Sequence, residues 1–140
     1  MLVTGRSSGI STVGQFVAAA KAKPGQLKFG STGIGTGTHL GVEKLNLEVG
    51  IKAVHVPARA GDAIADTIAN AVAGRTDYLL ALIQLALTDI RAGKLRALGV
   101  TAKKRSSLLP EVSTIAEAGV TGFDYPIWYG CGYPLALLPE

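Results

Sequence analysis

Apolar residues along the chain follow two alternating patterns, short continuous runs and longer segments with a helical period. Val13, Phe16, Val17 and Ala20 share one face of a predicted helix, which one of the two preceding hydroxyl residues caps. Further helices are predicted over residues 36–48, 62–73, 83–91 and 113–118. The apolar runs predict strands at residues 1–4, 27–30, 53–56, 76–82, 95–100 and 126–130.

Strands that alternate with helices are typical of βαβ units. The expected fold class is therefore α/β, a three-layer helix–sheet–helix lobe whose central sheet is mostly parallel. A hydrophobic share of 48% over 140 residues is enough for one such core and excludes a disordered chain. The predicted core includes Phe16, Val17, Leu40, Ile68, Leu80, Leu85 and Leu98.

Composition excludes several other classes of protein. The 18 glycines have no triplet period, so they serve turns and not a collagen helix. The single cysteine, Cys131, excludes an intrachain disulfide and an all-cysteine metal site. The longest apolar run, residues 78–87, is too short to span a bilayer, and the first residues do not resemble a signal peptide.

The positive net charge of +4 is concentrated in residues 91–105, which contain six basic residues and no acid. Such a cluster serves either as a surface for nucleic acid or an acidic partner, or as a solvated face. We favour the solvated face and expect no nucleic-acid partner, because no aromatic residue is interleaved with the charges. The six residues are Arg91, Lys94, Arg96, Lys103, Lys104 and Arg105.

The opening segment, residues 2–10, matches two enzymatic motifs. Its Thr4-Gly5 and Gly9-Ile10 resemble the phosphate-binding turn of short-chain dehydrogenases, which implies an NAD(P)-binding oxidoreductase. The Tyr with a Lys four positions later, which that family uses in catalysis, is missing from the sequence. The same glycines match the G-x-S-x-G elbow of serine hydrolases, but only a very short strand precedes them. We favour a capped loop over both alternatives.

The most informative segment lies between a predicted strand and a predicted helix, at residues 30–39. It holds four glycines and four hydroxyl residues and carries no Asp, Glu, Lys or Arg. Unpaired N–H groups at the start of a helix attract anions, and small residues let a carboxylate or phosphate approach them. We interpret the segment as an anion cradle, with a tight capped turn as the alternative.

Other polar residues have ordinary structural interpretations. His39 and His55 lack metal-ligand spacing and are predicted to be hydrogen-bonded structural residues. Asp62 and Asp66 lie one helical turn apart, where acids stabilise a helix N-terminus. The sequence therefore predicts no catalytic residues, no metal site and no cofactor.

Eight short motifs, in order along nearly the whole chain, resemble the substrate receptors of tripartite tricarboxylate transporters, the Bug-type extracytoplasmic solute-binding proteins. The motifs are KAKPG at 21–25, FGSTG at 29–33, HL at 39–40, HVP at 55–57, IRAGKLRAL at 90–98, LPEV at 109–112, TIAEAG at 114–119 and WYG at 128–130. The resemblance implies one lobe of a two-lobed periplasmic-binding-protein-like fold, with a carboxylate bound in the cleft by N–H groups, hydroxyls and water.

The resemblance also implies which residues contact the ligand. The expected ligand-binding residues are Ser31, Thr32, Gly33, Gly35, Thr36, Thr38, Arg59 and Gly61. Two departures alter the site: the loop after residue 57 lacks the aromatic and lysine residues usual in the family, and Ala81 replaces a frequent aspartate. The pocket floor is therefore expected to be less polar than usual.

The expected organisation is a single ligand-binding lobe with hinge strands at residues 1–130, followed by an irregular tail at 131–140 that is atypical of the family and indicates a truncated product. The expected function is non-catalytic capture of a small organic carboxylate in the periplasm, for delivery to the membrane components of the transporter. The exposed lobe or hinge surface favours a homodimer. The alternatives are the oxidoreductase-like fragment and a remnant that binds nothing.

Overall fold

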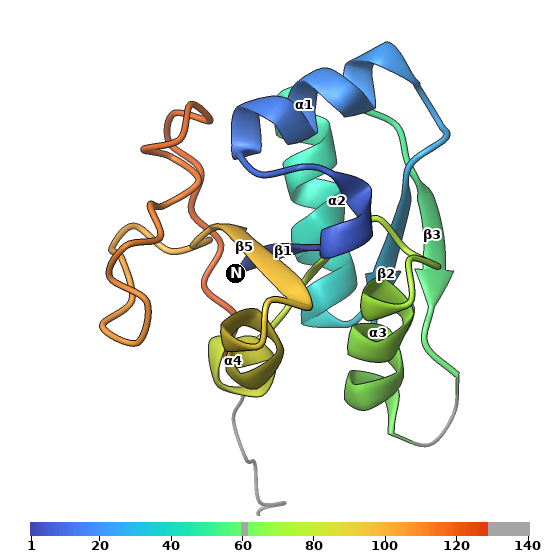
Figure 1. Ribbon diagram of the computed structural model, residues 1–140. Coiled ribbons are helices and arrows are strands. Elements are labelled where there is room, and N and C mark those ends of the chain that lie inside the picture. The colour runs from blue at the N-terminus through green and yellow to red at the C-terminus, as the bar shows by residue number, and fades with distance from the viewer. Residues whose placement is uncertain (60–61, 129–140) are drawn as a thin grey trace, which may run out of the picture.

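The computed structural model describes residues 1–59 and 62–128, which form one mixed sheet covered by helices on both faces (Figure 1). The strand order is β3-β2-β4-β1-β5. Strand β2 is parallel to both β3 and β4, whereas β1 is antiparallel to both β4 and β5. The strands are β1 (Leu2–Gly5), β2 (Lys28–Ser31), β3 (Val54–Pro57), β4 (Tyr78–Leu80) and β5 (Leu95–Gly99).

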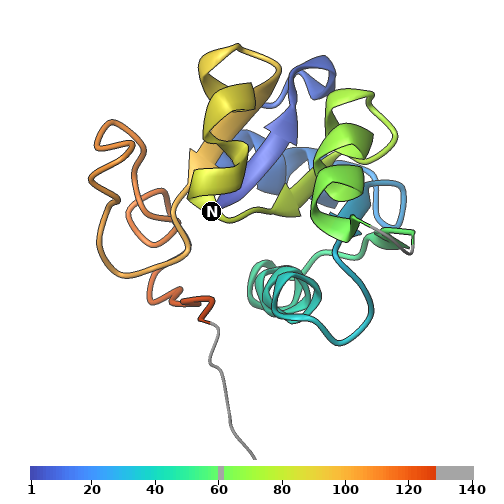
Figure 2. The same cartoon turned by 90° about the horizontal axis from the view of Figure 1, so that it is seen from below.

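Helices cover both faces of the sheet, which Figure 2 shows from below. The two core clusters assign two helices to each face. On one face, Leu2 and Tyr78 pack with α1 and α2; on the other, Val3 and Leu79 pack with α3 and α4. Successive strand residues point to opposite faces, so each strand contributes to both layers of the core. The helices are α1 (Val13–Ala22), α2 (Gly37–Val49), α3 (Ala63–Val72) and α4 (Ile83–Arg91), with a 3₁₀ turn at Arg6–Ser8.

Side-chain caps fix the start of three helices. The side chains of Thr12, Thr36 and Asp62 accept hydrogen bonds from the third N–H of α1, α2 and α3 respectively. A capping oxygen of this kind contributes about 1 kcal/mol to helix stability. In the described residues, α4 has no such cap, because the apolar Leu82 occupies the position.

The α/β fold predicted from the sequence is confirmed, with one addition to its sheet. The four strands predicted at residues 27–30, 53–56, 76–82 and 95–100 all run in the same direction. The fifth strand, β1, enters between β4 and β5 in the opposite direction, so the sheet is mixed. The predicted strand at 76–82 is only three residues long in the structure, because the chain turns toward α4 after Leu80.

The prediction that Leu40 and Leu85 belong to the core is wrong. Leu40 is 52% exposed because α2 turns Thr38, Gly41 and Val42 toward the sheet, which leaves residue 40 on the outer side. Leu85 is 45% exposed, because α4 packs through Ala86 instead. Phe16, Leu80 and Leu98 are buried as predicted, and Val17 and Ile68 are half-buried against the core, which completes the set.

The end of the described chain also differs from the prediction. Residues 113–118 form turns in place of a helix, although Thr114 pairs with Val100 in a parallel bridge. Residues 126–128 form no strand; residues 129 and 130 of that predicted strand lie outside the described residues, as does the predicted tail at 131–140. The segment before them packs on α2, where the Tyr125 hydroxyl donates to the Gly37 carbonyl at 3.0 Å.

Gly5 lies where β1 approaches α3 most closely. A Cβ atom at Gly5 would lie 2.2 Å from the Ala71 carbonyl oxygen, a backbone atom that cannot rotate away. Gly14, in contrast, lies in α1, and its nearest neighbour in that position would be the Thr12 hydroxyl at 3.9 Å. Gly5 therefore has no room for a side chain, whereas Gly14 does.

We expect Gly5→Ala to lower the free energy of unfolding by about 1–3 kcal/mol, because α3 must move to admit the methyl group. The matched control, Gly14→Ala, should raise it by about 0.5–1 kcal/mol, because alanine favours a helix where space allows. Urea denaturation of both variants beside the parent measures the difference. Equal effects of the two substitutions would contradict the packing of β1 against α3.

Candidate functional site

The strand order places a change of direction between β2 and β4. The chain passes from β2 to β3 on one side, then returns across β2 to reach β4. Helix α2 follows β2 on one face and α4 follows β4 on the other. Ligands of open α/β sheets bind outside the carboxyl ends of strands at such a point. Helices α2, α3 and α4 all begin at this edge, which is the lower edge of the sheet in Figure 1.

The loop between β2 and α2 depends on two glycines with positive φ. Gly33 has φ of 142° and Gly35 has φ of 79°, values that side chains with a Cβ rarely adopt. Between them, Ile34 is 79% exposed at the tip of the loop. The loop closes where the Thr36 N–H and hydroxyl both donate to the Gly33 carbonyl, at 3.3 and 2.7 Å.

Three threonine hydroxyls of this loop lie in one triangle. The Oγ1 atoms of Thr32, Thr36 and Thr38 are separated by 3.0 to 3.2 Å. The triangle is anchored because the Thr32 N–H donates to Thr38 Oγ1 at 3.1 Å. Thr36 uses its only hydroxyl proton on the Gly33 carbonyl. The hydroxyls therefore bind mainly one another and hold the loop in shape before any ligand arrives.

Several N–H groups of the loop remain unused. Within residues 1–59 and 62–128, the N–H groups of Ile34, Gly37 and Thr38 have no hydrogen-bond acceptor. Gly37 and Thr38 open α2, where the first N–H groups have no partner inside the helix and carry partial positive charge. No Asp or Glu lies in the first turn of α2. This arrangement suits an anion.

Ser31 ties the loop to its neighbours. Its side chain is fully buried, and Oγ lies 2.6 Å from His55 Nε2 and accepts the Gly33 N–H at 3.1 Å. Its carbonyl accepts the Ala58 N–H at 2.9 Å and lies 3.0 Å from the Thr67 hydroxyl. Ser31 thus connects β2, β3 and α3 beneath the loop.

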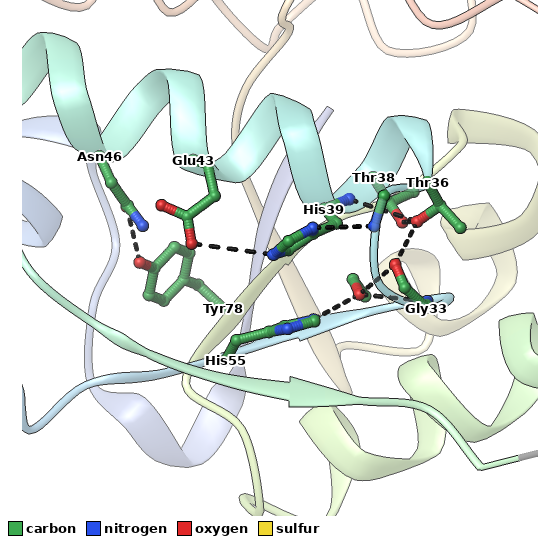
Figure 3. A network of polar contacts seen from close by, with 10 residues as sticks. Gly33, Thr36, Thr38, His39, Glu43, Asn46, His55 and Tyr78 are labelled. Atoms are coloured by element: carbon green, nitrogen blue, oxygen red, sulfur yellow. Dashed lines mark hydrogen bonds and ion pairs between the residues drawn. The ribbon is translucent and has the colours of Figure 1, made fainter.

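His39 and His55 form a stacked pair beside the loop, which the sequence alone did not indicate. Their ring centroids are 4.1 Å apart with 22° between the planes (Figure 3). Phe29 stacks on His55 with centroids 4.8 Å apart. The Gly35 N–H donates to His39 Nδ1 at 3.1 Å, and Glu43 Oε1 lies 3.9 Å from His39 Nε2. Burial, and after it the proximity of His39, lower the pKa of His55. Both histidines are hydrogen-bonded, as predicted, and both contact residues of the glycine loop.

An apolar crevice lies behind the loop. Thr32, Thr38 and Thr67 supply its polar groups. The remaining lining residues are apolar, and Ala81 is 5% exposed at the floor. They are Ile64, Ile68, Leu79, Leu80, Ala81, Leu82 and Leu85. That this crevice forms the less polar floor of the ligand pocket stays a prediction. A larger hollow of about 680 Å³ lies between α1, the end of α2 and residues 118–122, away from the glycine loop.

Arg59 lies apart from the other predicted ligand residues. It does not line the crevice; with Asp66, Asn70 and Arg75 it lines a separate hollow of about 340 Å³ on another side of α3. Its N–H donates to Asp66 Oδ2 at 3.0 Å. Gly61 lies outside the described residues. The structure therefore brings together Ser31, Thr32, Gly33, Gly35, Thr36 and Thr38, and separates Arg59 from them.

Three of the six basic residues of 91–105 lie beside an acid. Lys94 lies 3.5 Å from Asp89, Lys103 lies 3.5 Å from Asp124, and Arg105 Nε lies 2.9 Å from Glu117. Arg96 contacts the hydroxyl of Ser11. Acids at positions 89, 117 and 124, outside residues 91–105, thus compensate part of the charge of this segment.

The oxidoreductase alternative is not supported by the structure. A dinucleotide-binding turn joins a parallel strand to the helix of a βαβ unit, whereas β1 is antiparallel to both of its neighbours. Its Gly5 is required by the approach of α3, as the Ala71 carbonyl shows.

No helix within residues 1–59 and 62–128 has the length and apolar character that crossing a membrane requires.

Comparison with known proteins gives the family. A family profile described as tripartite tricarboxylate transporter family receptor matches residues 1–137, which is nearly the whole chain. The chain belongs to this receptor family. It is a family of transport receptors and not of enzymes, in agreement with the expectation that the chain is not an enzyme.

Individual relatives of this receptor family cover the chain but are much longer. A UPF0065 protein of Pseudomonas sp. (strain P51), encoded in the tcbD-tcbE intergenic region, is 37% identical over 96% of this chain and 39% of its own length. BugT of Bordetella pertussis is 29% identical over 100% of this chain and 42% of its own. The chain therefore spans about two fifths of the length of these relatives.

Two solved proteins of the same fold contain carboxylates. A protein of R. palustris with adipate superposes with a TM-score of 0.83 at 27% identity, covering 89% of this chain and 40% of that protein. MatC from Rhodopseudomonas palustris with bound malate gives 0.79 at 25% identity, covering 89% and 41%. The periplasmic binding protein BugD, at 21% identity and a TM-score of 0.79, has the same fold.

The lowered pKa of His55 predicts a loss of stability in acid. Below the ordinary histidine pKa of about 6.5, the unfolded chain binds a proton that the folded chain still excludes. The free energy of unfolding should therefore fall as the pH falls through that range. In His55→Gln, which removes the titrating ring, the fall should be smaller. Denaturation between about pH 8 and about pH 5 measures it, and equal slopes in both proteins would contradict the burial of a neutral His55.

Proposed function

We propose that this chain is a ligand-binding lobe of an extracytoplasmic solute receptor, which captures a small organic carboxylate for a tripartite tricarboxylate-type transporter and catalyses no reaction. The observation that supports it best is the set of unused N–H groups at the start of α2, at the point where the strand order reverses. Two solved relatives, with adipate and with malate, bind molecules of this class.

In the proposed complex, a carboxylate accepts hydrogen bonds from the backbone at Ile34, Gly37 and Thr38. Gly33 and Gly35 leave the approach to these groups open, and Thr32 and Thr36 border it. Ser31 and Thr38 are buried, so their side chains support the loop from behind. Charge-assisted hydrogen bonds of this kind contribute about 1.5–3 kcal/mol each. Arg59 and Gly61 belong to the loop after β3, which we propose as a second contact region.

The proposed lobe spans residues 1–130, and the proposed location is the periplasm, where receptors of this family hand their ligand to membrane components of the transporter. Family membership and the likeness to a periplasmic transporter support this location. A receptor of this kind needs only to bind its ligand and release it. The self-contained hydrogen bonding of the loop agrees with that role, because the site keeps its shape without ligand.

Replacing Thr36 by aspartate tests the cradle. Aspartate also caps helices, so α2 should keep its start, but the new charge lies beside the N–H groups that receive the carboxylate. We expect Thr36→Asp to weaken binding of adipate or malate at least about tenfold relative to Thr36→Asn, which has the same shape without the charge. Titration calorimetry measures the affinities.

Thr12→Asp serves as a second control, because Thr12 caps α1 in the same way and does not line the crevice behind the loop. It should leave carboxylate binding unchanged. If Thr36→Asp and Thr36→Asn bind equally well, the N-terminus of α2 is not the anion site. If the parent chain binds no carboxylate in a screen of organic acids, the receptor function itself is wrong for this chain.

Exposed apolar residues support a second proposal, self-association of the chain. Ile34, Ile64 and Leu85 are all at least 40% exposed, and all lie in segments at the carboxyl edge of the sheet. Contiguous exposed apolar surface favours association. Pairing through the predicted hinge strand at residues 2–4 would require the sheet to open, because both edges of β1 are already hydrogen-bonded.

We therefore expect a homodimer that uses the lobe surface around Ile34, Ile64 and Leu85. Light scattering over a range of concentrations should give the mass of two chains. Ile34→Ser together with Leu85→Ser should shift the mass toward one chain, whereas Leu47→Ser, an exposed leucine near the other end of α2, should not. A monomeric mass of the parent at every concentration would contradict the proposal.

A further inference from the structure

His39 connects α2 back to the loop that precedes it. The residue lies in the first turn of α2, and its ring accepts the N–H of Gly35, four residues earlier, at 3.1 Å. Gly35 lies next to the exposed tip of the loop and has a positive φ of 79°. Glycine residues on both sides of Ile34 make this part of the backbone easy to rotate. The bond to His39 is therefore a restraint at the position where the loop is least restrained by its own geometry.

The surroundings of His39 hold its ring in one orientation. One face stacks on His55 with centroids 4.1 Å apart (Figure 3). The Phe29 ring is nearly parallel to that of His39, with centroids 6.0 Å apart. Glu43 Oε1 lies 3.9 Å from Nε2. Because Nδ1 accepts the Gly35 N–H, the proton of the neutral ring is on Nε2, the nitrogen nearer to Glu43. Residues of β2, β3 and α2 thus hold Nδ1 of His39, the atom that accepts the Gly35 N–H, in a fixed position.

We propose that His39 is a positioning residue of the carboxylate site: through Nδ1 it fixes the peptide between Ile34 and Gly35 and so keeps the N–H groups of the loop arranged for the ligand. This rests on the proposed function of the loop. A peptide that ends in glycine flips more easily than one between residues with side chains, and a flip exchanges an N–H for a carbonyl oxygen. Binding to a loop that is already arranged costs less entropy than binding to one that must be ordered.

The alternative is that His39 serves only to pack against His55 and Phe29. Two substitutions separate these roles. The Oδ1 atom of asparagine occupies about the position of Nδ1, whereas the amide of glutamine reaches the position of Nε2. His39→Asn therefore keeps the acceptor for Gly35 and loses most of the ring, and His39→Gln keeps more of the packing and loses the acceptor.

Calorimetric titration with adipate and with malate gives the effect on binding. We expect His39→Gln to weaken the affinity at least about tenfold and His39→Asn to restore most of the loss. Hydrogen exchange of the Gly35 amide, followed by nuclear magnetic resonance on the unliganded chain, gives the effect on the loop. The amide should be protected in the parent and in His39→Asn, and should exchange faster in His39→Gln.

The two measurements distinguish failure of this proposal from failure of the receptor function. If the parent binds carboxylates and both variants bind equally well, or if His39→Gln binds better than His39→Asn, His39 only packs and the proposal is wrong. If the parent binds neither acid, the receptor proposal fails for these ligands, and the Gly35 exchange rates still decide the role of His39. Equal protection in the two variants would overturn it.

Discussion

The parallel pairing of β2 with both β3 and β4 is the constraint on which the rest of the site depends. Pairing on both edges leaves β2 no freedom to shift. The carbonyl of its last residue, Ser31, accepts hydrogen bonds from the Ala58 N–H and the Thr67 hydroxyl. Gly30 allows the close approach of α3, since a Cβ there would lie 3.0 Å from the Thr67 methyl group. The loop after β2 therefore starts from a fixed point, and α2 fixes its other end.

Within that frame, the loop satisfies most of its own hydrogen bonds. Three threonine hydroxyls bind one another, and the Gly33 carbonyl accepts from Thr36. The consequence for function is that side-chain hydroxyls have few protons left for a ligand, whereas backbone N–H groups at the start of α2 remain available. Under the proposed function, such a site recognises negative charge, and the apolar lining of the crevice behind the loop adds no further charge to the selection.

The stacked histidines couple the core to this loop. Phe29 and Tyr78 belong to the central core, and Phe29 stacks on His55, which stacks on His39. His55 reaches Ser31 at one end of the loop and His39 reaches Gly35 near the other. Two rings that are separated by sixteen positions in the sequence thus hold two points of one turn, and a change in core packing would be transmitted to the site.

The sequence by itself determined the α/β class, the cap at Asp62 and the position of the glycine loop, and it narrowed the start of each of the first two helices to two hydroxyl residues, because these features depend on residues close together in the chain. The structure then selected Thr12 and Thr36 as the caps. Tertiary structure alone decided that β1 runs antiparallel, that Leu40 and Leu85 face outward, and that His39 stacks on His55. Each of those outcomes depends on contacts between segments distant in sequence. Local period and propensity indicate the apolar face of a single helix, but they do not specify which distant segments pack against it or which rings meet across strands.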